Sequence, residues 1–476
     1  MDRVEFSAMK VGNTIVFLCA VMVTTMMKIT MGKGIYGALF IFGDSILDVG
    51  TNNHFNDSTA RADHQYYGVD YPDSVATGRF SNGYNSADLL ARYIADYTYS
   101  PPPFLSLVDR SGATFLQEIL EGANFASAGS GILIDTGHEK YGRVVSLGEQ
   151  IQQFSTIRGN ISESLGKSAA NIFLAMSTYI ISVGSNDFFE HQHALSLNQT
   201  EPEQLIANLT ATYSIHLQSL YDLGARKFAL IGIPPLGCCP IERFINLTLL
   251  QGDGGCVMAM NDLAQAFHAS TESLLQNFSS TNQGVVYSLG NTYNTILNFI
   301  DNPRANGFRV VETACCGNGT FNAEKKCERG SKLCVNRDEY LFWDEFHPTQ
   351  AASRQAALTL AYAEGPEFVT PMNFSSLANV FTYPLKKVVM PSENLLSSFR
   401  RQKNKYLKLK EKYKKMKNLQ RKSNGLVAEE RDWADSSDES FSDEEDTAYL
   451  CLIAKDVKDE PSETSSSSDP SPSTST

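Results

Sequence analysis

The sequence lacks an excess of positive charge. Its 476 residues include 40 Lys and Arg against 53 Asp and Glu, a formal net charge of −13. A protein held to nucleic acid by general electrostatics needs clustered basic residues, so the globular part is not expected to bind nucleic acid. The deficit belongs to the first 385 residues, which contain 23 basic and 36 acidic side chains, whereas the remainder has 17 of each.

Long apolar runs are also missing, except near the N-terminus. The 17 residues from Val11 to Met27 carry no charge and follow a short basic leader. As a helix they would span ~25 Å of a ~30 Å hydrocarbon core, which argues against a stable membrane anchor. The run is typical of a secretory signal peptide, expected over residues 1–34, although no clean small-x-small cleavage site follows it. We therefore expect a secreted, extracellular protein.

Cysteine is absent between residues 20 and 237. Cys19 belongs to the expected signal and Cys451 to the tail, and the other seven crowd into one stretch. In an exported chain they predict up to three disulfides and one leftover thiol. The alternative, a zinc site made from the last four, is disfavoured because adjacent cysteines fit poorly the gaps usual between paired ligands. The seven are Cys238, Cys239, Cys256, Cys315, Cys316, Cys327 and Cys334.

Acceptor sequences for N-glycosylation give weak support for export. Eight Asn-x-Ser/Thr sequences occur, and none lies in the tail. Chance alone would supply several in a chain this rich in Asn, Ser and Thr. The candidates are Asn56, Asn160, Asn198, Asn208, Asn246, Asn277, Asn318 and Asn373.

The composition changes abruptly after residue 384. Arg400 to Lys422 carries 12 basic residues and one acid, and Glu429 to Asp446 carries ten acids and one base. Such blocks cannot bury enough apolar surface to offset the entropy of ordering, so residues 385–476 are expected to form a disordered tail. A basic block is able to bind nucleic acid, but a signal peptide and disulfides direct the chain away from it.

Between residues 35 and 384, short apolar runs alternate with longer amphipathic stretches. Continuous apolar strands suit a parallel sheet covered on both faces, and strand and helix in repetition predict a doubly wound α/β domain. Ligands of such sheets bind beyond the carboxyl ends of the strands, so polar residues just after Phe42 and Val183 are site candidates. The expected strands are 38–42, 179–183 and 227–233, and the clearest helices are 201–223 and 258–278.

Four stretches carry side chains suited to nucleophilic catalysis. The first places Ser45 directly after a strand, where Gly43 permits a sharp turn. The second is rich in small residues that let backbone N–H groups approach a ligand. The third puts Asn186 at a strand end, and the fourth places Asp344 three residues before His347. The stretches are 42–53, 122–131, 181–188 and 343–349.

These residue types fit one reaction. A serine hydroxyl is a weak nucleophile at neutral pH and needs a base to accept its proton. His347 is the predicted base, and Asp344 would hold its tautomer and stabilise the imidazolium. The N–H groups of Ser45 and Gly129, with the side-chain amide of Asn186, would donate to the oxyanion. No cofactor is needed, and the neighbouring His191 and His193 lack the spaced acidic partners of a metal site.

Each residue has an ordinary structural alternative. Gly-Asp-Ser is a common turn sequence, Asn186 could cap a helix, and Asp344 with His347 could form a helix-end pair. The conjunction of all four stretches, each at an expected strand end or loop, favours the catalytic interpretation.

The four stretches resemble the conserved blocks of the plant GDSL esterases and lipases, a family of the SGNH hydrolase superfamily. The resemblance covers about 38–380, including the non-catalytic stretches 77–83 and 234–238. It implies a three-layer α/β/α sandwich with a flavodoxin-like strand order and an SGNH/GDSL hydrolase domain over 35–384. No Gly-x-Ser-x-Gly elbow occurs, which separates the chain from the α/β-hydrolases.

The resemblance also implies residue roles. Ser45 matches the nucleophile, Asp344 and His347 the acid and base, and Asn186 the third-block asparagine. Gly129 matches the second-block glycine, with Gly131 as the alternative register. The expected activity is hydrolysis of carboxylic esters or lipids through an acyl-enzyme.

Other consequences of the resemblance concern the cysteines, the tail and the competing functions. Either Cys238 or Cys239 is expected to pair with Cys256. In the tail, 433–440 and 449–454 resemble gag-type segments of plant retrotransposon polyproteins, which indicates a fused gene model or an insertion. Two alternatives to the esterase remain open: an acyltransferase on the same residues, or an inactive glycoprotein that binds the cell wall or carbohydrate.

Overall fold

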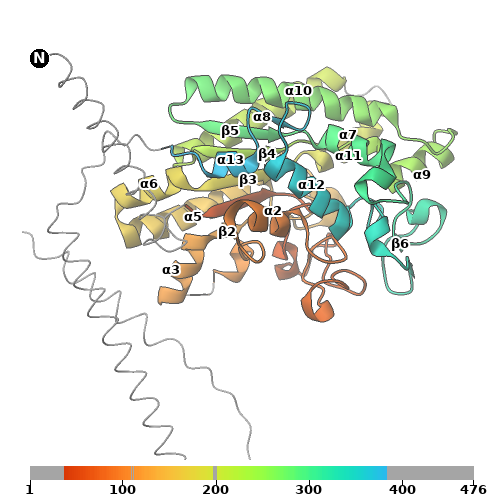
Figure 1. The fold of residues 1–476 in the computed structure, drawn as a ribbon, viewed down its shortest axis with the longest axis horizontal. Coiled ribbons are helices and arrows are strands. Elements are labelled where there is room, and N and C mark those ends of the chain that lie inside the picture. The colour runs from red at the N-terminus through yellow and green to blue at the C-terminus, as the bar shows by residue number, and fades with distance from the viewer. Residues whose placement is uncertain (1–36, 109, 111, 197–200, 383–476) are drawn as a thin grey trace, which may run out of the picture. The chain divides into compact units, whose positions relative to one another are not determined.

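A mostly parallel sheet forms the centre of the domain (Figure 1). The computed structural model describes residues 37–108, 110, 112–196 and 201–382, so the expected signal, the tail and Asn198 lie outside the described residues. Within them, six strands lie in the order β2-β1-β3-β4-β5-β8, with only β8 antiparallel to its neighbour. The strands are β1 (Leu39–Gly43), β2 (Gly122–Asn124), β3 (Thr178–Ser182), β4 (Lys227–Ile231), β5 (Val286–Gly290) and β8 (Val369–Thr370).

Both faces of the sheet are covered because its strands are apolar on both sides. In β1, Phe40 and Phe42 pack into one core cluster, while Leu39 and Ile41 pack into another on the opposite face. Successive side chains of a strand point to opposite faces, so a continuous apolar run requires two covering layers. The predicted α/β/α sandwich with its mostly parallel sheet is confirmed.

Helices form the two outer layers (Figure 1). Residues of α5, α6, α8 and α10 share the first cluster with Phe40 and Phe42, and residues of α2, α12 and α13 share the second with Leu39 and Ile41. No helix among the described residues is long and apolar enough to span a membrane. The helices are α2 (Ser86–Ala95), α3 (Gly112–Glu121), α4 (His138–Tyr141), α5 (Leu147–Leu165), α6 (Lys167–Met176), α7 (Ser185–Ser196), α8 (Pro202–Asp222), α9 (Pro240–Thr248), α10 (Met258–Thr281), α11 (Thr292–Asp301), α12 (Gln350–Tyr362) and α13 (Phe374–Ala378).

Local sequence signals fix the ends of the helices nearest the site. Helix α5 begins with a capping box between Ser146 and Glu149, and α2 with one between Asn85 and Asp88. Helix α12 begins at the carboxyl edge of the sheet, where the hydroxyl of Thr349 accepts the N–H of Ala352. Each cap satisfies N–H groups that a buried helix end would otherwise leave unpaired.

A buried ion pair holds the stretch 77–83, which the sequence analysis singled out as non-catalytic. Nε and Nη2 of Arg79 donate to the two carboxylate oxygens of Asp88 at 2.7 and 2.8 Å, and both side chains are almost fully buried. Asp88 also accepts the N–H groups of Asn85 and Ser100, so this one carboxylate joins three segments. The next residue, Phe80, is thereby directed toward the site.

We predict that Arg79→Met destabilises the protein by about 3–5 kcal/mol, because it leaves the Asp88 carboxylate buried without its cation. Urea unfolding followed by circular dichroism measures this. The matched control is Arg309→Ala, which breaks an ion pair to Glu339 whose arginine side chain is 72% exposed, and it should cost less than about 1 kcal/mol. Equal losses of unfolding free energy in the two variants would contradict the conclusion that the buried Arg79–Asp88 pair stabilises the fold.

Candidate active site

Ser45 lies in a turn that requires glycine at position 43. Gly43 ends β1 with φ of 147°, and a Cβ there would lie 2.1 Å from the carbonyl oxygen of Ser182 on the neighbouring strand. The N–H of Asp44 donates to that same oxygen at 3.0 Å, and the Asp44 carboxylate accepts the N–H of Ile46. This turn leaves Ser45 at the carboxyl edge of the sheet, partly exposed to a cavity.

The structure brings Ser45 together with His347 and Asp344, which lie some three hundred residues later. Nε2 of His347 lies 2.8 Å from Oγ of Ser45, and Nδ1 lies 2.8 and 2.9 Å from the two carboxylate oxygens of Asp344. The Asp344 carboxylate also accepts the backbone N–H groups of Phe346 and His347. Residues 343–346 form a bend before α12, so Asp344 and His347 are not a helix-end pair.

Burial and the nearby carboxylates have opposite effects on the pKa of His347. Burial by itself lowers the pKa of His347, but the adjacent Asp344 carboxylate and the charge of Glu345 outweigh burial and raise it above its usual value of 6.5. Burial also raises the pKa of Asp344, but His347 and the two N–H donors more than compensate and hold it below its ordinary value. The pair therefore favours an ionised carboxylate beside the imidazole.

Three groups able to donate to an oxyanion face the same cavity as Ser45. Among the described residues, the N–H groups of Ser45 and Gly129 donate to no protein acceptor. One Nδ2 hydrogen of Asn186 is used by the carbonyl of Ser130 at 2.9 Å, which leaves the other available. Gly129, with φ of 82°, lines the cavity, whereas Gly131 packs against the carboxylate of Asp187. The geometry thus favours Gly129 over Gly131 in the register that the sequence left open.

Two buried carboxylates, which no local sequence pattern marks as functional, connect these loops. Asp48 accepts the N–H of Ala128, the residue before Gly129, as well as those of Gly50 and Thr51. Asp187 accepts the N–H groups of Ile132 and Leu133. The bond from Ala128 to Asp48 and those from Ile132 and Leu133 to Asp187 join loops that follow different strands, so the positions of these loops depend on one another.

Gln150 of α5 supports the turn that carries Ser45. Its side-chain amide both donates to the carbonyl and accepts the N–H of Gly43, at 2.8 Å in each case, and it also donates to Ser130. A single glutamine on α5 therefore satisfies both backbone groups of Gly43 at the end of β1, and it also contacts the loop that follows β2.

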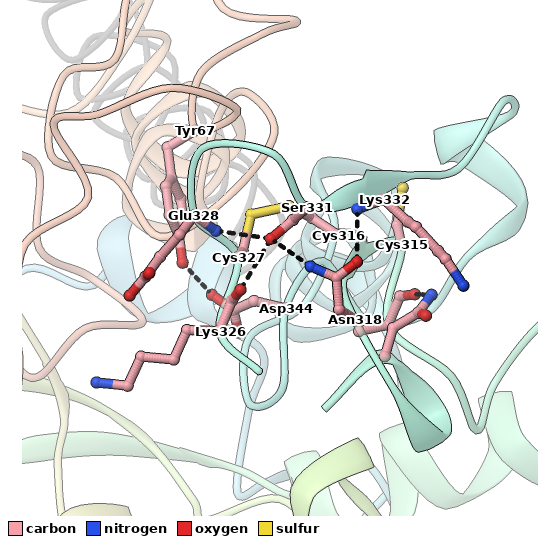
Figure 2. Close-up of a disulfide and its surroundings, with 12 residues drawn as sticks. Tyr67, Cys315, Cys316, Asn318, Lys326, Cys327, Glu328, Ser331, Lys332 and Asp344 are labelled. Carbon is pink, nitrogen blue, oxygen red and sulfur yellow. Dashed lines mark hydrogen bonds between the residues drawn. A yellow bond between two sulfur atoms is a disulfide. The ribbon is translucent and has the colours of Figure 1, made fainter. Parts of the chain in front are cut away.

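Tyr67 is a further contact of Asp344 (Figure 2). Its buried hydroxyl donates to Oδ2 of Asp344 at 2.8 Å, so this carboxylate has donors on both oxygens. Burial and the neighbouring carboxylates raise the pKa of Tyr67 well above its usual value, which keeps it a donor. The ring of Phe80 packs against that of His347 with centroids 4.7 Å apart.

The cysteines hold the segment that precedes Asp344. Cys315 pairs with Cys334 and Cys316 with Cys327, and the backbone N–H of Cys316 donates to the carbonyl of Trp343 at 2.7 Å. The short strands β6 (Cys316–Gly317) and β7 (Lys332–Leu333) pair within this disulfide-linked segment. Figure 2 shows the disulfide between Cys316 and Cys327. The four cysteines weighed as zinc ligands are thus engaged in disulfides.

The third disulfide resolves the choice between the adjacent cysteines 238 and 239. Cys238 pairs with Cys256, while Cys239 is a buried free thiol that lines the cavity. Burial raises the pKa of the Cys239 thiol well above its usual value. A buried, protonated thiol is a poor nucleophile.

The other candidates lie apart from Ser45. His191 contacts the carbonyl of Asp187, and no group of three His, Cys, Asp or Glu among the described residues is arranged to hold a metal. Of the glycosylation candidates within the described ranges, Asn56, Asn208 and Asn277 are exposed. The remaining four are partly buried: Asn160, Asn246, Asn318 and Asn373.

A cavity of about 470 Å³ opens beside Ser45. Its walls include Ser45, Gly129, Asn186 and His347, so the hydroxyl, the imidazole and the free donors face one space. An arrangement of this kind suits attack on a carbonyl carbon held between the hydroxyl and the donors.

Comparison with known proteins points the same way. The model of the GDSL-like lipase/acylhydrolase family matches residues 39–360. GDSL esterase/lipase At5g08460 of Arabidopsis thaliana is 34% identical over 352 residues, 72% of this chain and 88% of the relative. GDSL esterase/lipase At1g29660 of the same plant is 37% identical over 349 residues, 72% of this chain and 91% of the relative. The gag-type resemblance of the tail finds no support in these comparisons.

Proposed function

The chain belongs to the GDSL-like lipase/acylhydrolase family and is a carboxylester hydrolase, and on that premise we propose that it acts through an acyl-enzyme on Ser45. The observation that carries the proposal is the continuous contact from the Ser45 hydroxyl through His347 to Asp344, in a cavity that Gly129 and Asn186 also line. The fold itself hosts many functions, so the argument rests on this site.

Acylation begins when Oγ of Ser45 attacks the ester carbonyl carbon and Nε2 of His347 accepts the hydroxyl proton. The carbonyl oxygen becomes negatively charged and receives hydrogen bonds from the N–H groups of Ser45 and Gly129 and from the Asn186 amide. The imidazolium then gives its proton to the alkoxide oxygen of the leaving alcohol, and the C–O bond of the ester breaks.

Deacylation repeats these steps with water. His347 accepts a proton from the water that attacks the acyl carbon, and it returns that proton to Oγ of Ser45 as the acid leaves. Asp344 stays ionised throughout: it orients the imidazole and stabilises its protonated form. An alcohol bound in place of water would turn the same residues into a transferase.

The proposal also includes export. The uncharged run near the N-terminus, the disulfides and the exposed glycosylation candidates support a secreted enzyme of the apoplast or cell wall. Expression of the whole coding sequence in plant cells tests this, since the esterase activity should be recovered from the medium and not from the cell extract. That the tail is gag-type sequence joined to the hydrolase stays a prediction.

Substitution of Ser45 tests the activity. Ser45→Ala should lower kcat/KM on chromogenic acyl esters by at least about 10⁴-fold, because it removes the hydroxyl that His347 contacts and on which the acyl-enzyme would form. Ser185→Ala is the matched control: this serine lines the same cavity but makes no contact with His347 among the described residues, and it should stay within a few-fold of wild type. A Ser45→Ala protein as active as wild type would contradict the proposal, and an inactive wild type would favour the binding-glycoprotein alternative.

The pH profile tests the role of His347. Since His347 accepts a proton only when neutral, kcat/KM should fall as the pH drops through its pKa, with a midpoint above 6.5. The charges that face it are Asp344, Glu345 and Asp44, and burial raises the pKa of both Glu345 and Asp44 to about 7.

Glu345→Gln removes one of these negative charges and should move the midpoint of the acid limb to lower pH. Glu364→Gln, an exposed change away from the cavity, should leave it in place. The midpoint is read from kcat/KM measured between pH 5 and pH 9. An unchanged midpoint in Glu345→Gln, or an equal shift in the control, would contradict His347 as the titrating base.

A further inference from the structure

One face of α12 lines part of the cavity beside Ser45, and we call this part of the cavity its inner arm. This helix begins three residues after His347, and the residues that line the arm recur on the side turned toward β4 and α11. Four of the five lining residues on α12 are small, which leaves space that larger side chains would fill. On α12 the arm is lined by Ala352, Ser353, Ala356, Ala357 and Leu360, and across from it by Ile231, Gly232, Thr292 and Ile296.

Leu360 is the last residue of α12 that lines the inner arm. This side chain is buried in the core cluster and lies over β5, so close to Gly290 that a Cβ there would be 2.2 Å from Cδ2 of Leu360. From Ala352 to Leu360 the helix rises about 12 Å, at ~1.5 Å per residue. An extended chain of single bonds advances roughly 1.2 Å per bond, as the backbone does over three bonds per residue, so the arm holds about ten bonds.

The mouth of the cavity is polar, in contrast with the inner arm. Arg61, Lys140 and Lys326 line it, together with the carboxylates of Glu324 and Glu328. Figure 2 shows the side chains of Lys326 and Glu328 extending from the disulfide-linked loop on the side where Tyr67 reaches Asp344. Groups of both signs at an open rim can hydrogen-bond a hydroxylated molecule.

We propose that the substrate is an ester of a medium-chain aliphatic acid with a small polar alcohol. The proposal rests on the proposed function: the acyl chain lies in the inner arm and the alcohol at the charged mouth. A ligand with one apolar and one polar end matches a cavity with the same division, and desolvating the chain in a mostly apolar arm favours binding. Each methylene that enters the arm should raise kcat/KM by about fourfold, up to the length of the arm.

The wild-type test compares two series of esters. In the first, glycerol monoesters carry saturated acyl chains from acetyl to palmitoyl, and kcat/KM should rise to a maximum near decanoyl. In the second, acetate esters of n-alcohols of increasing length should give no such rise. A rise only in the second series would mean that the alcohol occupies the inner arm, which would overturn the placement of the acyl chain there. No rise in either series would overturn the proposal that the inner arm binds an aliphatic chain.

Substitutions on α12 test whether the acyl chain lies in the inner arm. Ala356→Leu narrows the arm and should lower the ratio of kcat/KM for decanoyl to acetyl esters at least about tenfold. Gln355→Leu adds similar bulk on the exposed side of the same helix and should leave that ratio unchanged. Leu360→Ala removes the end of the arm and should move the maximum to longer chains, a gain that misfolding cannot produce. Unchanged ratios in both Ala356→Leu and Leu360→Ala would overturn the proposal.

A binding measurement separates failure of the channel from failure of the esterase. Full-length Ser45→Ala protein is titrated with decanoate and with butyrate by calorimetry, and decanoate should bind at least about 100-fold more tightly. Loss of that difference on adding Ala356→Leu is the expected result. Equal binding of the two acids would overturn the channel whatever the esterase result, whereas tight decanoate binding by a protein whose wild type cleaves no ester would reject the proposed function and keep the channel.

Discussion

The buried carboxylate of Asp344 is the group on which the site depends most. It is almost fully removed from solvent, and an isolated charge in such a place would neutralise by shifting its pKa. Two backbone N–H groups, the imidazole of His347 and the hydroxyl of Tyr67 surround it instead, so its pKa stays below the ordinary value. Because one of these donors is the catalytic candidate His347, the bonds that satisfy the carboxylate also orient the imidazole toward Ser45.

The same requirement organises the loops at the carboxyl edge of the sheet. Asp48 and Asp187 are fully buried, burial raises the pKa of each, and each is held by N–H groups of a loop that follows another strand. The Arg79–Asp88 pair and the disulfides of the segment 315–334 act further out, where they fix Phe80 and Trp343 around the imidazole and its acid. These buried polar residues therefore stabilise the loops around the site and help to set its geometry.

The sequence alone predicts much of this arrangement. Apolar runs bounded by Gly, Ser and Asn locate β1, β3 and β4 to within one or two residues, and residues after β1 and β3 are where a doubly wound sheet binds ligands. Local spacing also finds Asp344 and His347. It does not find Tyr67 or Gln150, because their partners lie 277 and 107 residues away and neither belongs to a short motif. The sequence does not reveal the inner arm along α12 either, since an Ala-rich helix face has the same sequence pattern whether it packs tightly or borders a cavity.

Trapping the nucleophile tests the central claim most directly. An alkyl fluorophosphonate reacts with a serine only where a base and oxyanion donors activate it, and mass spectrometry of the digested protein locates the adduct. The account predicts one adduct, on Ser45, that is lost in His347→Ala while Ser185→Ala keeps it. An adduct on another residue, or none in a protein that hydrolyses esters, would contradict Ser45 as the nucleophile.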